Sequence, residues 1–394
     1  MRVTQQILTD RVMQNLNRIT SRILRVQDML SSGKSLRSPS DDPVRFNRVL
    51  DLRTTLVKLD RYTTNVEDAV DWLNIVDVSL AQVGNVLQEI RQLAVQGANG
   101  TLTQEDRNTI AARIEEALKE LLETANAQSG GKHLFGGTQT LTVPFTMEGN
   151  TITYWGDGAS MVRAVDENTT MEISFPGDQL FSRGFEVWSS NPVTLNPGDR
   201  FTVNGVEIEI DATMTTIQDL VNRINNDVTL KQSVYAFSDG TRLFLRSRTD
   251  DPPVLADTSG TPLQDWGILD AGGAIVEGNS RESSGIFKTI QKLIAHLRAG
   301  DQERISGEDI ANLDAAIDDT LRIRSQVGAR TSRLENALNR LGDLALNFKK
   351  LLSTNEDIDL AEVIMQLKEQ QSVYETALAA AAQVIQPTLL DFLR

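Results

Sequence analysis

The chain of 394 residues contains no cysteine, and its other scarce residues also narrow the possible functions. Without cysteine there can be no disulfide, no thiolate metal ligand and no cysteine nucleophile. Aromatic residues make up only 5% of the chain against 40% for all hydrophobic residues, so we expect an aliphatic core. The two histidines, His133 and His296, lie far apart and outside any HExxH or Cys/His pattern, so we expect no metal site and no cofactor.

Basic residues are also in short supply, with 39 against 54 acidic ones and a net charge of −15. This balance argues against nucleic acid as a partner, because phosphate binding needs a surplus of Lys and Arg. We expect no membrane partner, since no uncharged apolar run approaches the ~18 residues that span a bilayer. Charged residues interrupt the first 30 positions, so we also expect no cleaved signal peptide.

Composition divides the chain into three parts. Seven of the ten prolines fall between Pro144 and Pro262, whereas the segments on either side are rich in helix-forming residues. We predict a mainly α fold, in which long helices at both ends form a coiled-coil bundle around a central β-rich α+β insert. The predicted domains are 1–40 with 355–394 (terminal coiled-coil helices), 41–140 with 283–354 (a rod of long helices), and 141–282 (the outer insert).

Near each end, apolar residues recur at alternating spacings of four and three, which is typical of a coiled-coil seam. The predicted assembly interface consists of Val12, Leu16, Ile19, Ile23, Val26 and Leu30 in the first segment, and Leu360, Ile364, Leu367, Tyr374, Leu378 and Ile385 in the last. A coiled-coil scaffold with no further function would show the same stripes. The stripes alone therefore do not establish assembly.

The two ends also differ in charge. Residues 1–40 carry seven basic and two acidic side chains, whereas residues 355–394 carry seven acidic and two basic ones. Opposite charge favours pairing of two helices that each expose an apolar stripe. The alternative is that the two helices are solvated independently and differ in charge by chance.

Local signals predict where the helices of the rod begin and end. Pro43 suits the first position of a helix over about 44–96, and Thr103 with Asp106 predicts a capping box for the next helix. The seam of the long helix is predicted at Ala69, Leu73, Val76, Leu80, Val83, Leu87, Ile90 and Ala94.

The C-terminal arm and the insert give further signals. Ser306 with Asp309 predicts the start of a helix that runs to about residue 352, with Leu313, Ile317 and Leu321 on its apolar face. In the insert, alternating residues flank Asn204-Gly205, which is the signature of a type I′ β-hairpin.

We find no catalytic pattern. Adjacent carboxylates such as Asp41-Asp42 lie in expected turns or on helix faces, and no GxSxG or phosphate-binding glycine loop is present. We therefore predict that the chain is not an enzyme. Two rival hypotheses are an enzyme with its site in the insert and a cytoplasmic coiled-coil signalling scaffold.

Several short motifs resemble the flagellin family, whose terminal helices pack together around a variable central insert. The matching residues are Met1-Arg2-Val3-Thr4, Leu30-Ser-Ser-Gly-Lys34, Ser38-Pro-Ser-Asp-Asp-Pro43 and Lys132-His-Leu-Phe-Gly-Gly-Thr138. Within this family, the opening residues and the Asp-Asp-Pro turn favour the junction proteins between hook and filament. The ending Thr388-Leu-Leu-Asp-Phe-Leu-Arg394 departs from the usual endings of both, but it is similar to the Leu-Leu-Arg close of flagellin itself, which is the alternative.

The resemblance implies a structural subunit of the bacterial flagellum that forms an adaptor ring with copies of itself. Its neighbours would be a hook-associated protein on the hook side and flagellin on the filament side. The resemblance also implies type III export to the extracellular flagellum, with a cytoplasmic chaperone bound to the C-terminal helix.

Overall fold

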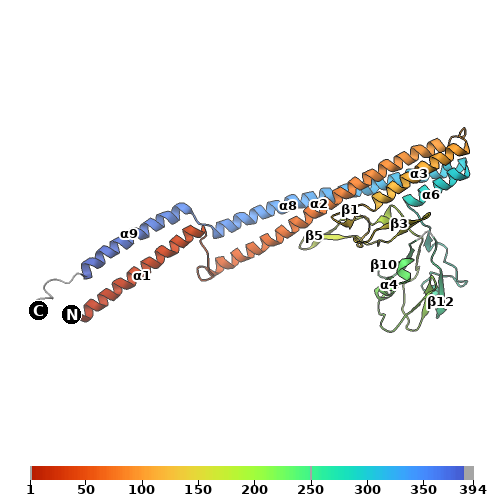
Figure 1. The fold of residues 1–394 in the computed structure, drawn as a ribbon. Coiled ribbons are helices and arrows are strands. Elements are labelled where there is room, and N and C mark those ends of the chain that lie inside the picture. Colours follow the sequence, from red (N-terminus) through yellow and green to blue (C-terminus); the bar gives the residue numbers. More distant parts are fainter. Residues whose placement is uncertain (1, 249–250, 386–394) are drawn as a thin grey trace. The chain divides into compact units, whose positions relative to one another are not determined.

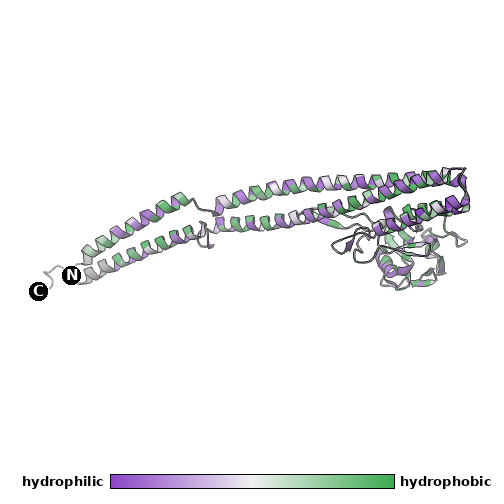
Figure 2. Cartoon of the chain, turned by 45° about the horizontal axis from the view of Figure 1, so that its top comes forward, coloured by the Kyte–Doolittle hydropathy of each residue, from purple (hydrophilic) through white to green (hydrophobic). Residues whose placement is uncertain are grey.

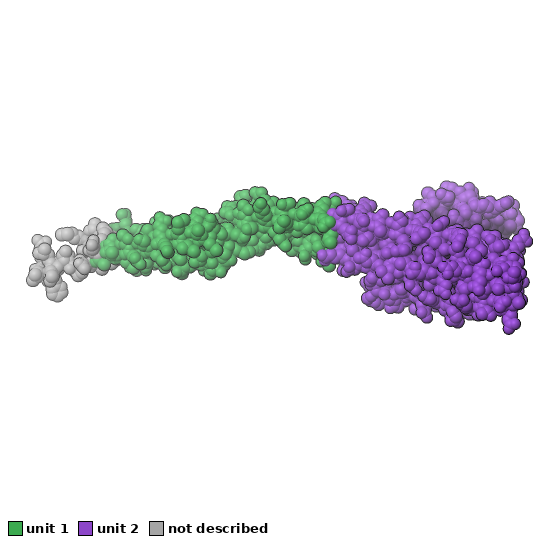
Figure 3. Space-filling model, turned by 90° about the horizontal axis from the view of Figure 1, so that it is seen from above, with its two compact units in different colours: residues 1–64, 338–394 green, residues 65–337 purple. Residues whose placement is uncertain are grey.

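The structure, a computed structural model, describes residues 2–248 and 251–385 and is mainly helical, as predicted (Figure 1). The chain divides into two compact units, residues 1–64 with 338–394 (unit 1) and residues 65–337 (unit 2), which Figure 3 colours separately. The elements of unit 1 within the described residues are helices, and unit 2 combines helices with the strand-rich insert. The division into three domains stays a prediction.

Unit 1 contains α1 (Arg2–Ser32), α9 (Leu360–Ile385), the first part of α2 (Pro43–Gly97) and the last part of α8 (Ile310–Glu356). Helix α1 ends where Gly33 adopts a φ of +68°, a conformation that favours glycine. Helix α2 begins as predicted, because the Asp42 side chain accepts hydrogen bonds from the backbone N–H groups of Val44 and Arg45.

In unit 2, the remaining parts of α2 and α8 accompany α3 (Gln104–Ala125) and α6 (Ile286–Ala299). The predicted seam of α2 is confirmed, since all eight residues from Ala69 to Ala94 in that series are 0% exposed. The capping box of α3 is also confirmed, with Thr103 and Asp106 bonded reciprocally. Ion pairs from Asp77 to Arg324 and from Arg91 to Asp314 join α2 to α8.

The prediction for the start of the C-terminal helix was wrong. Helix α7 (Gln302–Arg304) begins earlier, with Asp301 as its cap, and residues Ile305–Asp309 form a π-helical turn that leads directly into α8. Ser306 therefore does not cap a helix. Leu321 is 52% exposed, since the buried face of α8 follows a different line, through Leu313, Ala316, Thr320, Ile323 and Val327.

The insert starts with three two-stranded sheets. They pair β1 (Gln128–Ser129) with β2 (Lys132–His133), β3 (Phe145–Glu148) with β4 (Thr151–Tyr154), and β5 (Val162–Asp166) with β6 (Thr169–Glu172). A short 3₁₀ turn, Gly177–Gln179, follows.

The rest of the insert is the predicted α+β module. It has a four-stranded sheet in the order β10-β11-β7-β13 and a three-stranded sheet in the order β12-β8-β9, together with α4 (Ile217–Asn226) and α5 (Pro262–Asp265). The strands are β7 (Glu186–Trp188), β8 (Arg200–Val203), β9 (Val206–Glu209), β10 (Val234–Ser238), β11 (Leu243–Ser247), β12 (Leu255–Ser259) and β13 (Ser280–Arg281). The hairpin at Asn204-Gly205 is confirmed, with φ angles of +50° and +80°.

Candidate assembly interface

Helices α1 and α9, from the two ends of the chain, lie side by side and run antiparallel (Figure 1). All six residues predicted on α1 are at least partly buried: Val26 is buried, and Val12, Leu16, Ile19, Ile23 and Leu30 are half-buried. Figure 2 shows hydrophobic and hydrophilic residues alternating along both helices. The predicted line on α1 is thus the face of this helix that α9 covers within a single subunit.

On α9, only part of the predicted line is covered within the chain. Leu367 and Tyr374 are half-buried, whereas Leu360, Ile364 and Leu378 are 57%, 42% and 43% exposed. The covered line instead runs through Val363, Leu367, Tyr374, Ala377 and Ala381. The side chain of Ile385 lies outside the described residues.

The face of α9 toward α1 is therefore rotated from the predicted one, and the reason lies in the sequence. Helix α9 carries two overlapping apolar lines, both with spacings of four and three, which share Leu367, Tyr374 and Ala381. The line that includes Val363 and Ala377 lies toward α1. The line with Leu360, Ile364 and Leu378 stays exposed in the single subunit.

Further large apolar side chains are exposed in unit 1. They are Ile7, Met13 and Leu24 on α1, Met365 and Val373 on α9, Val44, Leu50 and Val57 on α2, and Leu344, Leu346 and Leu351 on α8. Large contiguous patches of exposed apolar residues are typical of contact surfaces between proteins. All four helices of unit 1 thus present apolar groups to solvent in the single subunit.

The charge contrast between the two ends does not produce ion pairs between α1 and α9 among the side chains that the structure describes. The exposed side chains Arg11, Arg18, Arg22 and Arg25 make no such pair there, and Arg37 instead pairs with Asp28 at 3.0 Å. The apolar seam therefore holds α1 and α9 together, and the basic side chains of α1 stay exposed to solvent.

Glu356, the last residue of α8, joins the two linkers that connect the terminal helices to α2 and α8. Its carboxylate, almost fully buried, accepts from Lys34 Nζ at 2.6 Å and forms a second ion pair with Arg53. Its carbonyl accepts from the Ser35 N–H at 2.7 Å, and the Ile358 N–H donates to Gly33 at 3.2 Å. The sequence analysis missed this cluster, because its members are more than 300 positions apart and Glu356 lies in an acidic run.

The two histidines are bonded to protein groups. His133 Nδ1 lies 2.8 Å from the carbonyl of Asn126, and His296 Nδ1 lies 2.7 Å from Asp309 Oδ2. Burial raises the pKa of Asp309, and the hydrogen bond and charge of His296 oppose this rise. Across the described ranges, no three potential ligands cluster to hold a metal ion, and no helix is long and apolar enough to span a membrane.

Comparison with known proteins places these helices in a family. The chain matches the bacterial flagellin N-terminal helical region over residues 3–140 and the bacterial flagellin C-terminal helical region over residues 310–393. It is 26% identical over 275 residues to flagellar hook-associated protein 3 of Escherichia coli, covering 70% of this chain and 84% of that protein. Flagellin of Clostridium tyrobutyricum is 22% identical, with 98% of this chain and 99% of that protein covered.

Among solved structures, hook-associated protein 3 of Legionella pneumophila is 19% identical and covers 77% of this chain and 97% of that chain, with a TM-score of 0.49. The two matched helical regions take in α1, α2, α3, α8 and α9, and so include the paired terminal helices described above. Because both regions match and together make up more than half of its length, the chain belongs to the flagellin family of flagellar structural proteins.

Proposed function

We propose that this chain is a structural adaptor at the junction of hook and filament in the bacterial flagellum, without enzymatic activity. One observation carries the proposal: α1 and α9 cover one apolar line each and leave further large apolar side chains exposed. Burying a Leu or Ile side chain stabilises a contact by about 1.5–3 kcal/mol, so these faces favour assembly strongly. The similarity to hook-associated protein 3 over most of its length supports the junction rather than another part of the flagellum.

The partners follow from this position. Copies of the chain form a ring through the outward faces of α1 and α9, with a hook-associated protein on one side and flagellin on the other. Before export, a cytoplasmic chaperone covers the apolar residues of α9, because Leu360, Ile364 and Met365 would otherwise promote premature association. The chain then leaves the cell through the flagellar type III apparatus.

The second candidate is flagellin itself. The flagellin of Clostridium tyrobutyricum aligns with nearly the whole chain, including the insert, and this favours a filament subunit. The two candidates share the fold and differ in copy number and place. A junction subunit forms a short ring, whereas a filament subunit repeats along the whole flagellum.

Imaging separates the candidates. An epitope inserted between Glu167 and Asn168, at the exposed tip of the β5–β6 hairpin, should label intact flagella without disturbing the helices. We expect one labelled band per flagellum at the boundary of hook and filament, and a deletion strain that builds hooks but sheds flagellin into the medium. Label along the filament would assign the chain as flagellin, and flagella without label would contradict both assignments.

A further inference from the structure

A groove in the insert is not explained by assembly through the terminal helices. It has a volume of about 800 Å³ and lies between the segment after β4, helix α4 and strand β10. This volume falls within the range of small-molecule and cofactor sites, about 300–1,000 Å³. All of its walls belong to unit 2.

The floor of the groove contains aromatic side chains in fixed positions. Trp155, Tyr235 and Phe237 are half-buried, and the rings of Tyr235 and Phe237 stack with centroids 6.0 Å apart and planes 22° apart. Trp155 is held by a hydrogen bond of 2.8 Å from its Nε1 to Thr146. Phe237 also stacks on Phe244, with centroids 4.9 Å apart, so Trp155 and Tyr235 are the rings left to contact a ligand.

Amide side chains line the wall opposite. Gln218, Asn222, Asn225 and Asn226 project from one face of α4, and Gln232 follows in the next turn. Asn226 and Gln232 are exposed, and their amides make no hydrogen bond within the part of the chain that the structure describes. Each amide offers a donor and an acceptor side by side, which matches two neighbouring hydroxyl groups.

The hydrogen bonds of strand β10, on another side of the groove, do not favour an extended peptide as the ligand. Strand β10 is at the edge of its sheet, where a peptide would add as a further strand. However, the side chain of Asn225 already bonds both backbone groups of Ala236, at 2.7 and 2.8 Å. This edge is therefore closed to backbone pairing.

The charged residues of the groove are mainly basic. Lys231 and Arg248 lie in its lining, and the one carboxylate there, Asp157, is bonded to Thr138. The guanidinium of Arg248 lies over the rings of Trp155 and Tyr235, at 5.7 and 5.9 Å.

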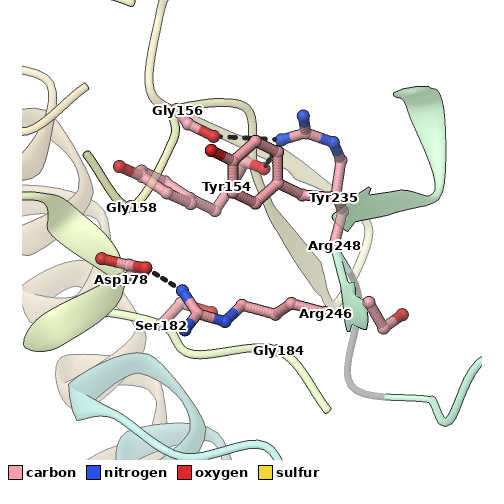
Figure 4. A pocket seen from close by; sticks show the side chains of 10 residues that line it. Tyr154, Gly156, Gly158, Asp178, Ser182, Gly184, Tyr235, Arg246 and Arg248 are labelled. Carbon is pink, nitrogen blue, oxygen red and sulfur yellow. Dashed lines mark hydrogen bonds and ion pairs between the residues drawn. The ribbon is translucent and has the colours of Figure 1, made fainter. Parts of the chain in front are cut away.

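Arg248 and its neighbour Arg246 differ in their partners, as Figure 4 shows. Arg246 is neutralised by Asp178 and Glu186. Arg248 donates to the carbonyls of Tyr154 (2.7 Å), Gly156 (3.2 Å) and Lys231 (2.7 Å), and no carboxylate of residues 2–248 or 251–385 forms an ion pair with it. A half-buried cation bonded to carbonyls alone favours an anionic ligand beside it.

We infer that this groove binds an acidic oligosaccharide. Trp155 and Tyr235 contact the C–H faces of the sugars, the amides of Asn226 and Gln232 pair with hydroxyl groups, and Arg248 and Lys231 face the sugar carboxylates. This binding is independent of the junction role, since α1 and α9 contribute nothing to the groove.

Isothermal titration of the full chain with a hexamer of galacturonate tests the inference, with a neutral hexamer of β-linked glucose as the second ligand. We expect the galacturonate hexamer to bind and the neutral one to bind at least tenfold more weakly, which corresponds to about 1.4 kcal/mol. The double variant N226A/Q232A should weaken binding about tenfold, and so should Arg248→Gln. Asn168→Ala, an exposed amide outside the groove, is the matched control and should change nothing.

The N226A/Q232A double variant changes only exposed side chains, so it keeps the fold even if Arg248→Gln does not. The inference is overturned if the galacturonate hexamer does not bind at millimolar concentration, or binds the double variant as well as the unaltered chain. Equal binding of the two hexamers would also overturn it. An acidic peptide that binds in the groove more tightly than the sugar would overturn it too.

Discussion

At the scale of single residues, Glu356 has the clearest structural role. Its buried carboxylate holds Lys34 and Arg53, and its backbone joins the linkers at both ends of the chain. We expect Glu356→Gln to lower the free energy of unfolding by about 1–2 kcal/mol, because both ion pairs are lost. The loss stays this small because Lys34 and Arg53 are half-exposed and water can solvate their charges in the variant. Urea unfolding measures the change, and Glu369→Gln, at an exposed position of α9, is the control. Equal unfolding midpoints for both variants would show that the cluster contributes nothing.

His296 and Asp309 give a prediction that depends on pH. Burial raises the pKa of Asp309 above its ordinary value, so the folded chain binds this proton more tightly than the unfolded chain. Its contribution to stability is therefore most favourable below the unfolded pKa, about 3.9, and declines as the pH rises through the folded pKa.

Replacing His296 with Gln removes the hydrogen bond that opposes the effect of burial on Asp309. We expect a loss of about 1–3 kcal/mol at pH 8, and a smaller loss near pH 4, where the Asp309 carboxyl is increasingly protonated. Urea unfolding of both chains at the two pH values measures this. A loss that is the same at both, or larger near pH 4, would contradict the assignment.

At the scale of elements, the two apolar lines of α9 give a matched pair of variants. Leu367 lies on the covered line and Leu378 on the exposed one. Leu367→Asp places a charge in the α1–α9 seam, so it should disrupt pairing of these helices within the free subunit. Leu378→Asp should leave the free subunit unchanged in circular dichroism and thermal unfolding.

Both variants should block incorporation into flagella, which is measured by labelling and by the shedding of flagellin. Leu367→Asp should block incorporation because it disrupts helix pairing within the subunit. Leu378→Asp should block it because it disrupts contacts with neighbouring subunits. If Leu378→Asp subunits entered flagella normally, the outward line of α9 would not be an assembly surface.

Individual elements show how far the sequence predicts the fold. The line on α2 was predicted residue by residue, because the series from Ala69 to Ala94 is apolar at every position, and it is fully buried. On α9 two lines compete, and periodicity cannot choose between them. The start of α8 was misplaced because Ser306 and Asp309 fit a capping pattern, whereas the π-helical turn allows the helix to continue from Asp301.

At the scale of the whole molecule, the mainly helical class and the central α+β insert were predictable from proline content and periodicity. The Glu356 cluster and the groove were not, because both depend on residues that are distant in sequence. Lys34 and Glu356 are 322 positions apart, and the groove combines Trp155 with α4 and Arg248. Local patterns carry no signal for such pairs.

The account rests on the claim that the paired terminal helices are completed by assembly. An isolated pair of helices with apolar groups left exposed is only marginally stable in water. The seams of α2 and α8 in unit 2, by contrast, are fully buried and should persist in the free subunit.

Amide hydrogen exchange, measured on the monomer and on purified hook–filament junctions, tests this claim most directly. We predict rapid exchange in residues 12–32 and 360–382 of the monomer, slow exchange in residues 66–94 in both states, and strong protection of the terminal helices only in the junction. Strong protection of residues 12–32 and 360–382 in a proven monomer would contradict the account.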